Sequence, residues 1–199
     1  MPIFLSGLGL GLSLIMALGP QNIFLIRQGA LRKHAVLSAI TCFFCDVILV
    51  TLSVIGLHHA LELHPGVQVW MSWIGAIFLL FYGGRSLKSA LKSSAAILQL
   101  SHQSLSRAKI IFLALGFSLL NPHAIIDSLV LIGGGSSQYP DHPKLFLMGV
   151  ITSSLVWFTA LTWLAYFFAE QLTQAKIWRR VEFVSGLLMI YLAFKLAVL

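Results

Sequence analysis

Six apolar stretches recur along the sequence, and each is long enough to cross a lipid bilayer as a helix. Because a helix rises about 1.5 Å per residue, roughly 20 residues cross a hydrocarbon core of about 30 Å. The stretches lack the strict alternation of polar and apolar residues that a β-barrel strand requires. They cover Ile3–Ile26, Ala35–Ala60, Val67–Gly84, Ile110–Ile132, Leu145–Ala169 and Val181–Leu199. The sequence therefore predicts an all-α polytopic membrane protein with six transmembrane helices, forming a single domain over residues 1–199.

The charged residues predict how these helices are oriented. The chain is 58% hydrophobic and 10% charged, with a net charge of +7, and 11 of its 13 Lys and Arg residues lie in three alternate connections. Cytoplasmic loops carry such an excess, which predicts that both termini lie outside the bacterial inner membrane. Basic residues dispersed over loops do not indicate nucleic-acid binding. The three groups are Arg27, Arg32 and Lys33; Arg85, Lys88, Lys92, Arg107 and Lys109; and Lys176, Arg179 and Arg180.

The first apolar stretch is predicted to be a span and not a signal peptide. It has no basic residue at its amino end, and Pro20 follows the small residues near Ala17 that would have to form a cleavage site. A five-span alternative stays open, because a helix broken at Pro20 is able to enter the membrane without crossing it. Gly7 and Gly11 have small-xxx-small spacing. We expect close packing within the monomer, and a homo-oligomer stays open.

The fourth stretch contains the segment Asn121-Pro122-His123-Ala124-Ile125-Ile126-Asp127. Proline removes one backbone donor, and a carboxylate at membrane depth costs about 2.5–3.5 kcal/mol on insertion scales. Both are tolerated only where they face protein or a water-filled cavity. The segment is therefore interpreted as part of a path for something polar.

The first stretch contains a similar break at Leu18-Gly19-Pro20-Gln21-Asn22. When Pro20 is aligned with Pro122, Leu18 matches Leu120 and a weak repeat emerges. Three spans in each half make the repeat inverted, with repeat 1 over about 1–84, a basic cytoplasmic loop over about 85–109 and repeat 2 over about 110–199. Broken helices at matching positions of two halves indicate a transporter site near the bilayer midplane.

Two acidic residues, Asp46 and Asp127, are predicted to lie at membrane depth. One reading is a buried polar anchor, but intramembrane carboxylates are functional by default. The only intramembrane cation is Lys195, which lies near the carboxyl end. Its side chain extends to the outer surface more easily than it extends to either aspartate. The two carboxylates are therefore expected to be available for the ammonium or guanidinium group of a substrate, or for a proton.

His123 lies four residues before Asp127, so a helix would place both on one face. It either relays protons or hydrogen-bonds the carbonyl that Pro122 leaves free, and both alternatives stay open.

The basic loop is expected to lie on membrane lipid. Trp178, beside the last span, is expected to be an interfacial anchor.

Cys42 and Cys45 have the spacing of a thiol redox pair, but inside a membrane helix cysteine is chiefly a small packing residue. We expect no cofactor. No metal site is expected either, because the histidines of one short outer loop are interpreted as a solvated cluster. They are His58, His59 and His64.

The motif Leu18-Gly19-Pro20-Gln21-Asn22, followed by Arg27-Gln28-Gly29, resembles the first-span motif of the LysE family of amino-acid exporters, in particular its lysine and arginine branch. Asp46 is similar to the family's second-span aspartate, and Asn121-Pro122-His123 with Asp127 resembles its fourth-span element. The resemblance covers essentially the whole chain. Two positions depart from the basic branch, where a tryptophan and a tyrosine are usual, because this chain has Leu119 and Ile125.

The resemblance and the residues together imply a transporter and not an enzyme: a secondary-active exporter of L-arginine or L-lysine, coupled to protons or another ion, or driven by the membrane potential. No GxxxxGK nucleotide-binding loop is present. The predicted substrate and ion site comprises Asp46, Asp127, Asn22, Gln21, Asn121 and His123, with helix breaks at Gly19, Pro20 and Pro122. The alternatives are export of a neutral amino acid or a metal cation, or a thiol-disulfide electron carrier using Cys42 and Cys45.

Overall fold

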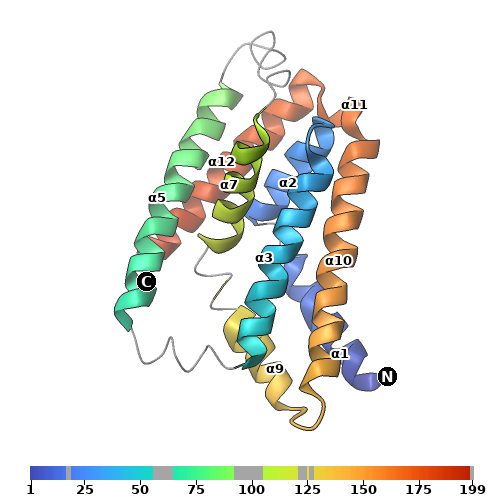
Figure 1. The fold of residues 1–199 in the computed structure, drawn as a ribbon. Helices are drawn as coiled ribbons and strands as arrows, with labels where there is room; N and C mark the ends of the chain where they lie inside the picture. Colours follow the sequence, from blue (N-terminus) through green and yellow to red (C-terminus); the bar gives the residue numbers. More distant parts are fainter. Residues whose placement is uncertain (17–18, 56–64, 92–104, 121–124, 126–127, 198–199) are drawn as a thin grey trace.

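The computed structural model describes residues 1–16, 19–55, 65–91, 105–120, 125 and 128–197 (Figure 1). Every regular element in these residues is a helix. The helices are α1 (Pro2–Ile15), α2 (Pro20–Ala30), α3 (Ala35–Ile55), α5 (Pro65–Ala90), α7 (Arg107–Leu119), the π-helical segment η1 (Ser128–Ile132), α9 (Gly133–Ser137), α10 (Pro143–Phe167), α11 (Ala169–Leu172) and α12 (Ala175–Ala197).

The predicted break in the first span is confirmed. Helix α2 begins at Pro20, and its axis makes an angle of 81° with that of α1. Proline is favoured at the first position of a helix, because a backbone N–H at that position would have no hydrogen-bond partner within the helix. Gly19 precedes it with an extended backbone, φ −97° and ψ 176°. The sequence thus ends one helix and starts another inside a single apolar stretch.

Together, α1 and α2 run along the whole length of α10. Gly7 lies against Phe146 at the start of α10, and Gly29 lies against Ala165 near its end. Residue numbers increase in the same direction in both, so the two short helices follow α10 in the same chain order in spite of the bend between them. The pair therefore extends from one end of the bundle to the other.

The contact between α1 and α10 is close because both helices present glycine. A Cβ atom at Gly7 would lie 2.2 Å from the carbonyl oxygen of Phe146, and one at Gly149 would lie 2.2 Å from that of Phe4. At Gly11 it would meet the Ser153 hydroxyl at 2.1 Å. Small residues let helix backbones approach in this way. The packing of Gly7 and Gly11 within the monomer is confirmed.

A second set of short helices runs along α3. Helix α7 ends at Leu119, before Pro122, and Ser118 lies beside Cys42 in the middle of α3. Gly133, at the start of α9, approaches Ser53 near the end of α3, where an added Cβ atom would lie 3.0 Å from the Ser53 carbonyl oxygen. Helices α7 and α9 thus lie along α3 in the same chain order.

Helices α5 and α12 form an antiparallel pair around Gly83 and Gly186, where a Cβ atom on either would lie about 3 Å from the carbonyl oxygen of the other. The main core is formed where this pair meets α2, α7 and α10, with Phe24 and Phe117 in ring contact at 5.4 Å. Large apolar side chains also cover the outer surface, as expected for helices that face lipid. They include Phe44, Ile77, Phe81, Phe112, Trp163, Tyr191 and Phe194.

Among the described residues, α3 and α10 are each long and apolar enough to cross a membrane, and the bent pair α1 plus α2 adds a third span if it is counted as one. Figure 1 shows the α2–α3 connection, the end of α5, the start of α7 and α11 at one end of the bundle. The N-terminus and α9 lie at the other end. The connections that carry most of the basic residues therefore share one end.

Candidate functional site

Asp46 lies in the middle of α3, where its side chain is half-buried against α10. The hydroxyl group of Ser154 donates a hydrogen bond to its Oδ2 atom. Ser154 is itself buried and also forms a long hydrogen bond, of 3.4 Å, to the Val150 carbonyl oxygen. Among the described residues, no Lys or Arg forms an ion pair with Asp46. The carboxylate is stabilised by a neutral donor and keeps acceptor capacity to spare.

Asn22 bridges the break between α1 and α2. Its Nδ2 atom donates to the carbonyl oxygen of Ile15 at 2.9 Å, and its Oδ1 atom accepts from Nε1 of Trp157 at 3.2 Å. A helix that ends at a break leaves its last carbonyl groups without partners. The Asn22 carboxamide supplies a hydrogen-bond donor for one of these carbonyl groups, and through Trp157 it connects α1 and α2 to α10. Asn22 is only 4% exposed, so this arrangement is part of the core.

The Cys42 thiol lies close to Gln21, in the first turn of α2, and to Ser118, in the last turn of α7. Neither the Gln21 Nε2 atom nor the Ser118 hydroxyl has a hydrogen-bond partner in the part of the chain that the structure describes, and both atoms are buried. Buried polar groups are usually paired, so two such groups at one place need an explanation.

These contacts form one cluster. Ser154 and Trp157 are one turn apart on α10, as Cys42 and Asp46 are on α3, so the side chains connect α2, α3, α7 and α10. We call this the central polar cluster. Its members are Gln21, Asn22, Cys42, Asp46, Ser118, Ser154 and Trp157.

The structure thus brings together Gln21, Asn22 and Asp46 of the predicted site, at the break that Gly19 and Pro20 create. The other predicted residues lie outside the described residues, namely Asn121, Pro122, His123 and Asp127. Ile125, one of the two departures from the family pattern, is buried. Ser118, Ser154 and Trp157 were not predicted, because serine and tryptophan are ordinary residues in membrane helices and only the packing reveals their neighbours.

A second carboxylate was missed by the sequence analysis. Glu182 on α12 is 1% exposed, pairs with Nη2 of Arg27 at 2.9 Å and accepts a hydrogen bond from Ser86 on α5. It follows Arg179 and Arg180 at the start of the last apolar stretch. Trp178 is also buried, with Arg27 above its ring at 5.8 Å, so it packs inside the bundle and is not the interfacial anchor that its position predicted. Arg27 draws both residues into the core.

Cys42 and Cys45 are both buried and not joined by a disulfide bond. Cys42 is fully enclosed within the main core, and its thiol faces the two unpaired groups described above. The packing interpretation accounts for both cysteines.

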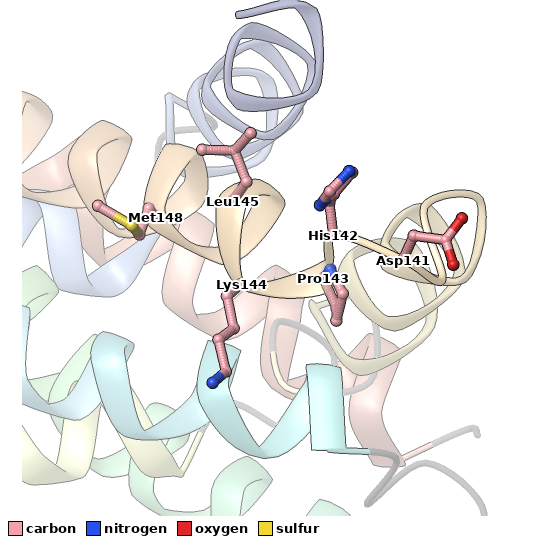
Figure 2. Close-up of a pocket in the computed structure, with 6 residues that line it drawn as sticks. All are labelled: Asp141, His142, Pro143, Lys144, Leu145 and Met148. Carbon is pink, nitrogen blue, oxygen red and sulfur yellow. The ribbon is translucent and has the colours of Figure 1, made fainter.

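An open depression of about 560 Å³ lies apart from this cluster, at the start of α10. Figure 2 shows that its polar side chains Asp141, His142 and Lys144 point in different directions and do not converge on a common point. It contains none of the predicted site residues. The depression is completed by Pro143, Leu145 and Met148.

Comparison with known proteins identifies the family. The model of the LysE type translocator family matches residues 12–199. A protein of Aeromonas salmonicida named putative amino-acid transporter YggA is 34% identical over 194 residues, covering 97% of this chain and 94% of the relative. The arginine exporter protein ArgO of Salmonella schwarzengrund (strain CVM19633) and that of Klebsiella pneumoniae (strain 342) are each 34% identical over 195 residues, covering 98% of this chain and 92% of the relative.

No solved structure matches this chain. The family model covers all of the sequence except residues 1–11, and so includes the helix break at Pro20 and the central polar cluster. The members of this family are translocators, so the chain is a transporter and not an enzyme. The chain belongs to the LysE type translocator family.

Proposed function

We propose that this protein exports a basic amino acid, L-arginine and/or L-lysine, across the bacterial inner membrane by secondary-active transport, driven by the proton gradient or the membrane potential. Several of its relatives at 34% identity carry the name arginine exporter, over nearly the full length of both chains. The cargo is thus an amino acid with a positively charged side chain.

The observation that carries this proposal is the state of Asp46. A carboxylate inside a membrane helix is costly unless it meets a positive charge or several donors. Asp46 has one described donor, the Ser154 hydroxyl, and no described cation. A guanidinium or ammonium group of the cargo would supply the missing charge.

The arrangement of the helices supports two inverted repeats of three spans. The first broken span, α1 plus α2, is parallel to α10, which belongs to the second half of the chain. The second broken segment, α7 through α9, is parallel to α3, which belongs to the first half. The remaining helices of the two halves, α5 and α12, pair with each other. Exchanging the halves leaves these pairings unchanged, as an inverted repeat requires.

The same arrangement supports six spans with both termini outside. Contacts of α1 near the start of α10 and of α2 near its end favour a broken span over a loop that returns to its own side. The basic connections share the opposite end of the bundle from the N-terminus, and an excess of Lys and Arg marks the cytoplasmic side.

Within this scheme the two halves rock around the central polar cluster, with each broken helix contributing to the site. Asp46 receives the cationic end of the cargo. Asp127, the second aspartate predicted at membrane depth, is its partner in our proposal, with Asn121 and His123 beside the second break. These three residues rest on the sequence alone.

The test is export by the Asp46→Asn variant from cells preloaded with labelled arginine or lysine. Removing one partner of a desolvated charge pair costs about 2–5 kcal/mol, which corresponds to a loss of about 30-fold or more in the rate at low cargo concentration. The matched control is Asp141→Asn, because Asp141 is an exposed aspartate at the outer depression.

Export by the control should equal that of the unmodified protein, and both variants should reach the membrane in equal amounts. Normal arginine and lysine export by Asp46→Asn would refute the proposal. Loss of export of neutral amino acids instead of basic ones would assign a different cargo.

A further inference from the structure

Two buried hydrogen-bond donors in the central polar cluster have no described partner, and they lie at the two helix breaks. Gln21 follows Pro20 at the start of α2, and its Nε2 atom is buried and unpaired. Ser118 lies in the last turn of α7; the residue is 4% exposed and its hydroxyl group is unpaired. Both side chains lie close to the thiol of Cys42.

Such groups are costly unless something pairs with them at another stage of the cycle. An amide N–H and a hydroxyl, each removed from water, lose their solvent hydrogen bonds without compensation. Both are able to donate to one anion, and Gln21 lies in the first turn of α2, where the helix dipole favours negative charge. The chemistry of the pair therefore suits a carboxylate.

Asn22, the nearest alternative for this role, is already engaged. Its Nδ2 atom donates to Ile15 and its Oδ1 atom accepts from Trp157, so it holds the broken span to α10. Loss of these bonds would release the junction of α1 and α2. The carboxamide that remains for a ligand is that of Gln21.

The position of the pair relative to Asp46 matches the two ends of a basic amino acid. Cys42, which both donors flank, precedes Asp46 by one turn on the same face of α3. Four residues of helix correspond to a rise of about 6 Å. The α-carboxylate and the side-chain cation of extended arginine or lysine are separated by a comparable length.

We propose that Gln21 and Ser118 form a subsite for the α-carboxylate of the cargo, one helical turn from the carboxylate of Asp46 that binds its cation. This inference rests on the proposed function and adds to it a second recognition point. It makes the protein selective for amino acids over the corresponding amines, which carry the same cation but no carboxylate.

The test uses purified full-length protein in lipid nanodiscs and two ligand pairs, L-arginine with agmatine and L-lysine with cadaverine. Displacement of labelled amino acid gives a ratio of dissociation constants, amine over amino acid, for each variant. The unmodified protein should prefer the amino acid. The ratio should fall about tenfold or more in Ser118→Ala and in Gln21→Leu, because each loses a donor to a charged group.

Three further variants separate this effect from a general one. Ser118→Thr keeps the hydroxyl and should keep the ratio. Ser53→Ala is the matched control, since Ser53 is a buried serine on α3 whose hydroxyl already donates to the Leu49 carbonyl. Asp46→Asn should weaken amino acid and amine alike and leave the ratio unchanged. Burial of Cys42 and Cys45, measured as slow reaction with a maleimide, reports that each variant is folded.

An unchanged ratio in both Ser118→Ala and Gln21→Leu, with arginine or lysine still bound, would overturn the subsite while leaving the proposed function in place. Failure of the unmodified protein to bind either amino acid would overturn the proposed function, and the subsite with it.

Discussion

Two carboxylates lie inside the helical bundle in contrasting surroundings. Glu182 is enclosed between α5 and α12, paired with Arg27 and bonded to Ser86. Asp46 lies between α3 and α10, where a single serine hydroxyl donates to it and no described cation is near. The chemical group is the same, but among the described residues only Glu182 is paired with a cation.

The difference shows how burial of charge separates structural from functional acids in this protein. A buried carboxylate with a fixed guanidinium partner gains little from any further cation. When one member of such a pair is removed, the other is left as an uncompensated buried charge, which lowers the stability of the fold. A carboxylate with only a neutral donor still gains from a positive charge that arrives and departs. This is why we assign the cargo to Asp46, and why Glu182 is treated as an anchor of the bundle.

The largest expected effect concerns the stability of the Arg27–Glu182 pair. Arg27→Met leaves an almost fully buried carboxylate unpaired and should lower the free energy of unfolding by about 3–5 kcal/mol. Glu182→Gln leaves the arginine, which is 35% exposed and is able to turn to water, so it should cost less. Unfolding in detergent is followed by the exposure of Cys42 and Cys45 to a thiol-reactive dye. Equal losses in the two variants would contradict this account.

Unlike the Arg27–Glu182 pair, Asp46 should contribute little to the free energy of unfolding. Asp46→Asn keeps an oxygen that accepts from Ser154, so the free energy of unfolding should change by less than about 1 kcal/mol even though export is lost. The same thiol-exposure measurement applies, with Glu182→Gln as the reference. A loss of stability larger than that of Glu182→Gln would mean that Asp46 is itself a structural anchor.

Effects smaller than that of Arg27→Met are expected from the two serines that donate to the carboxylates. Ser86→Ala removes one of two described partners of Glu182, and Ser154→Ala removes the only described donor to Asp46. A hydrogen bond to a charged group contributes about 1.5–3 kcal/mol, so Ser154→Ala should lie near the upper part of this range and Ser86→Ala near the lower part. The order of the two melting temperatures is the measurement, and the reverse order would remove the distinction between the two sites.

Part of the fold was predictable from local chemistry. Proline cannot continue a helix without losing a hydrogen bond, so Pro20 in an apolar stretch predicted the start of α2 correctly. The glycines at 7 and 11 predicted a close helix contact for a similarly local reason. Asp46 was selected because charge at membrane depth is rare and expensive.

Other features depend on which helices pack against each other in the folded chain. The sequence predicted Gln21 and Asn22 as equivalent polar residues at a break, but their partners differ. Asn22 reaches Ile15 and Trp157, whereas the amide of Gln21 is left unpaired beside Cys42. Glu182 was not singled out from the sequence, because its partner, Arg27, is far away along the chain. Long-range pairing of this kind has no local signal.

The sequence by itself determined the class of this protein, its family and the helix break at Pro20, because hydrophobic length, charge distribution and proline act locally. The tertiary structure decided which polar groups near that break are hydrogen-bonded and which are not. Packing of α2, α3, α7 and α10 gives Asn22 its partners, leaves Gln21 and Ser118 without one, and sets a hydroxyl rather than a cation against Asp46. A hydrogen bond requires two groups within about 3 Å, and only the folded chain brings them that close.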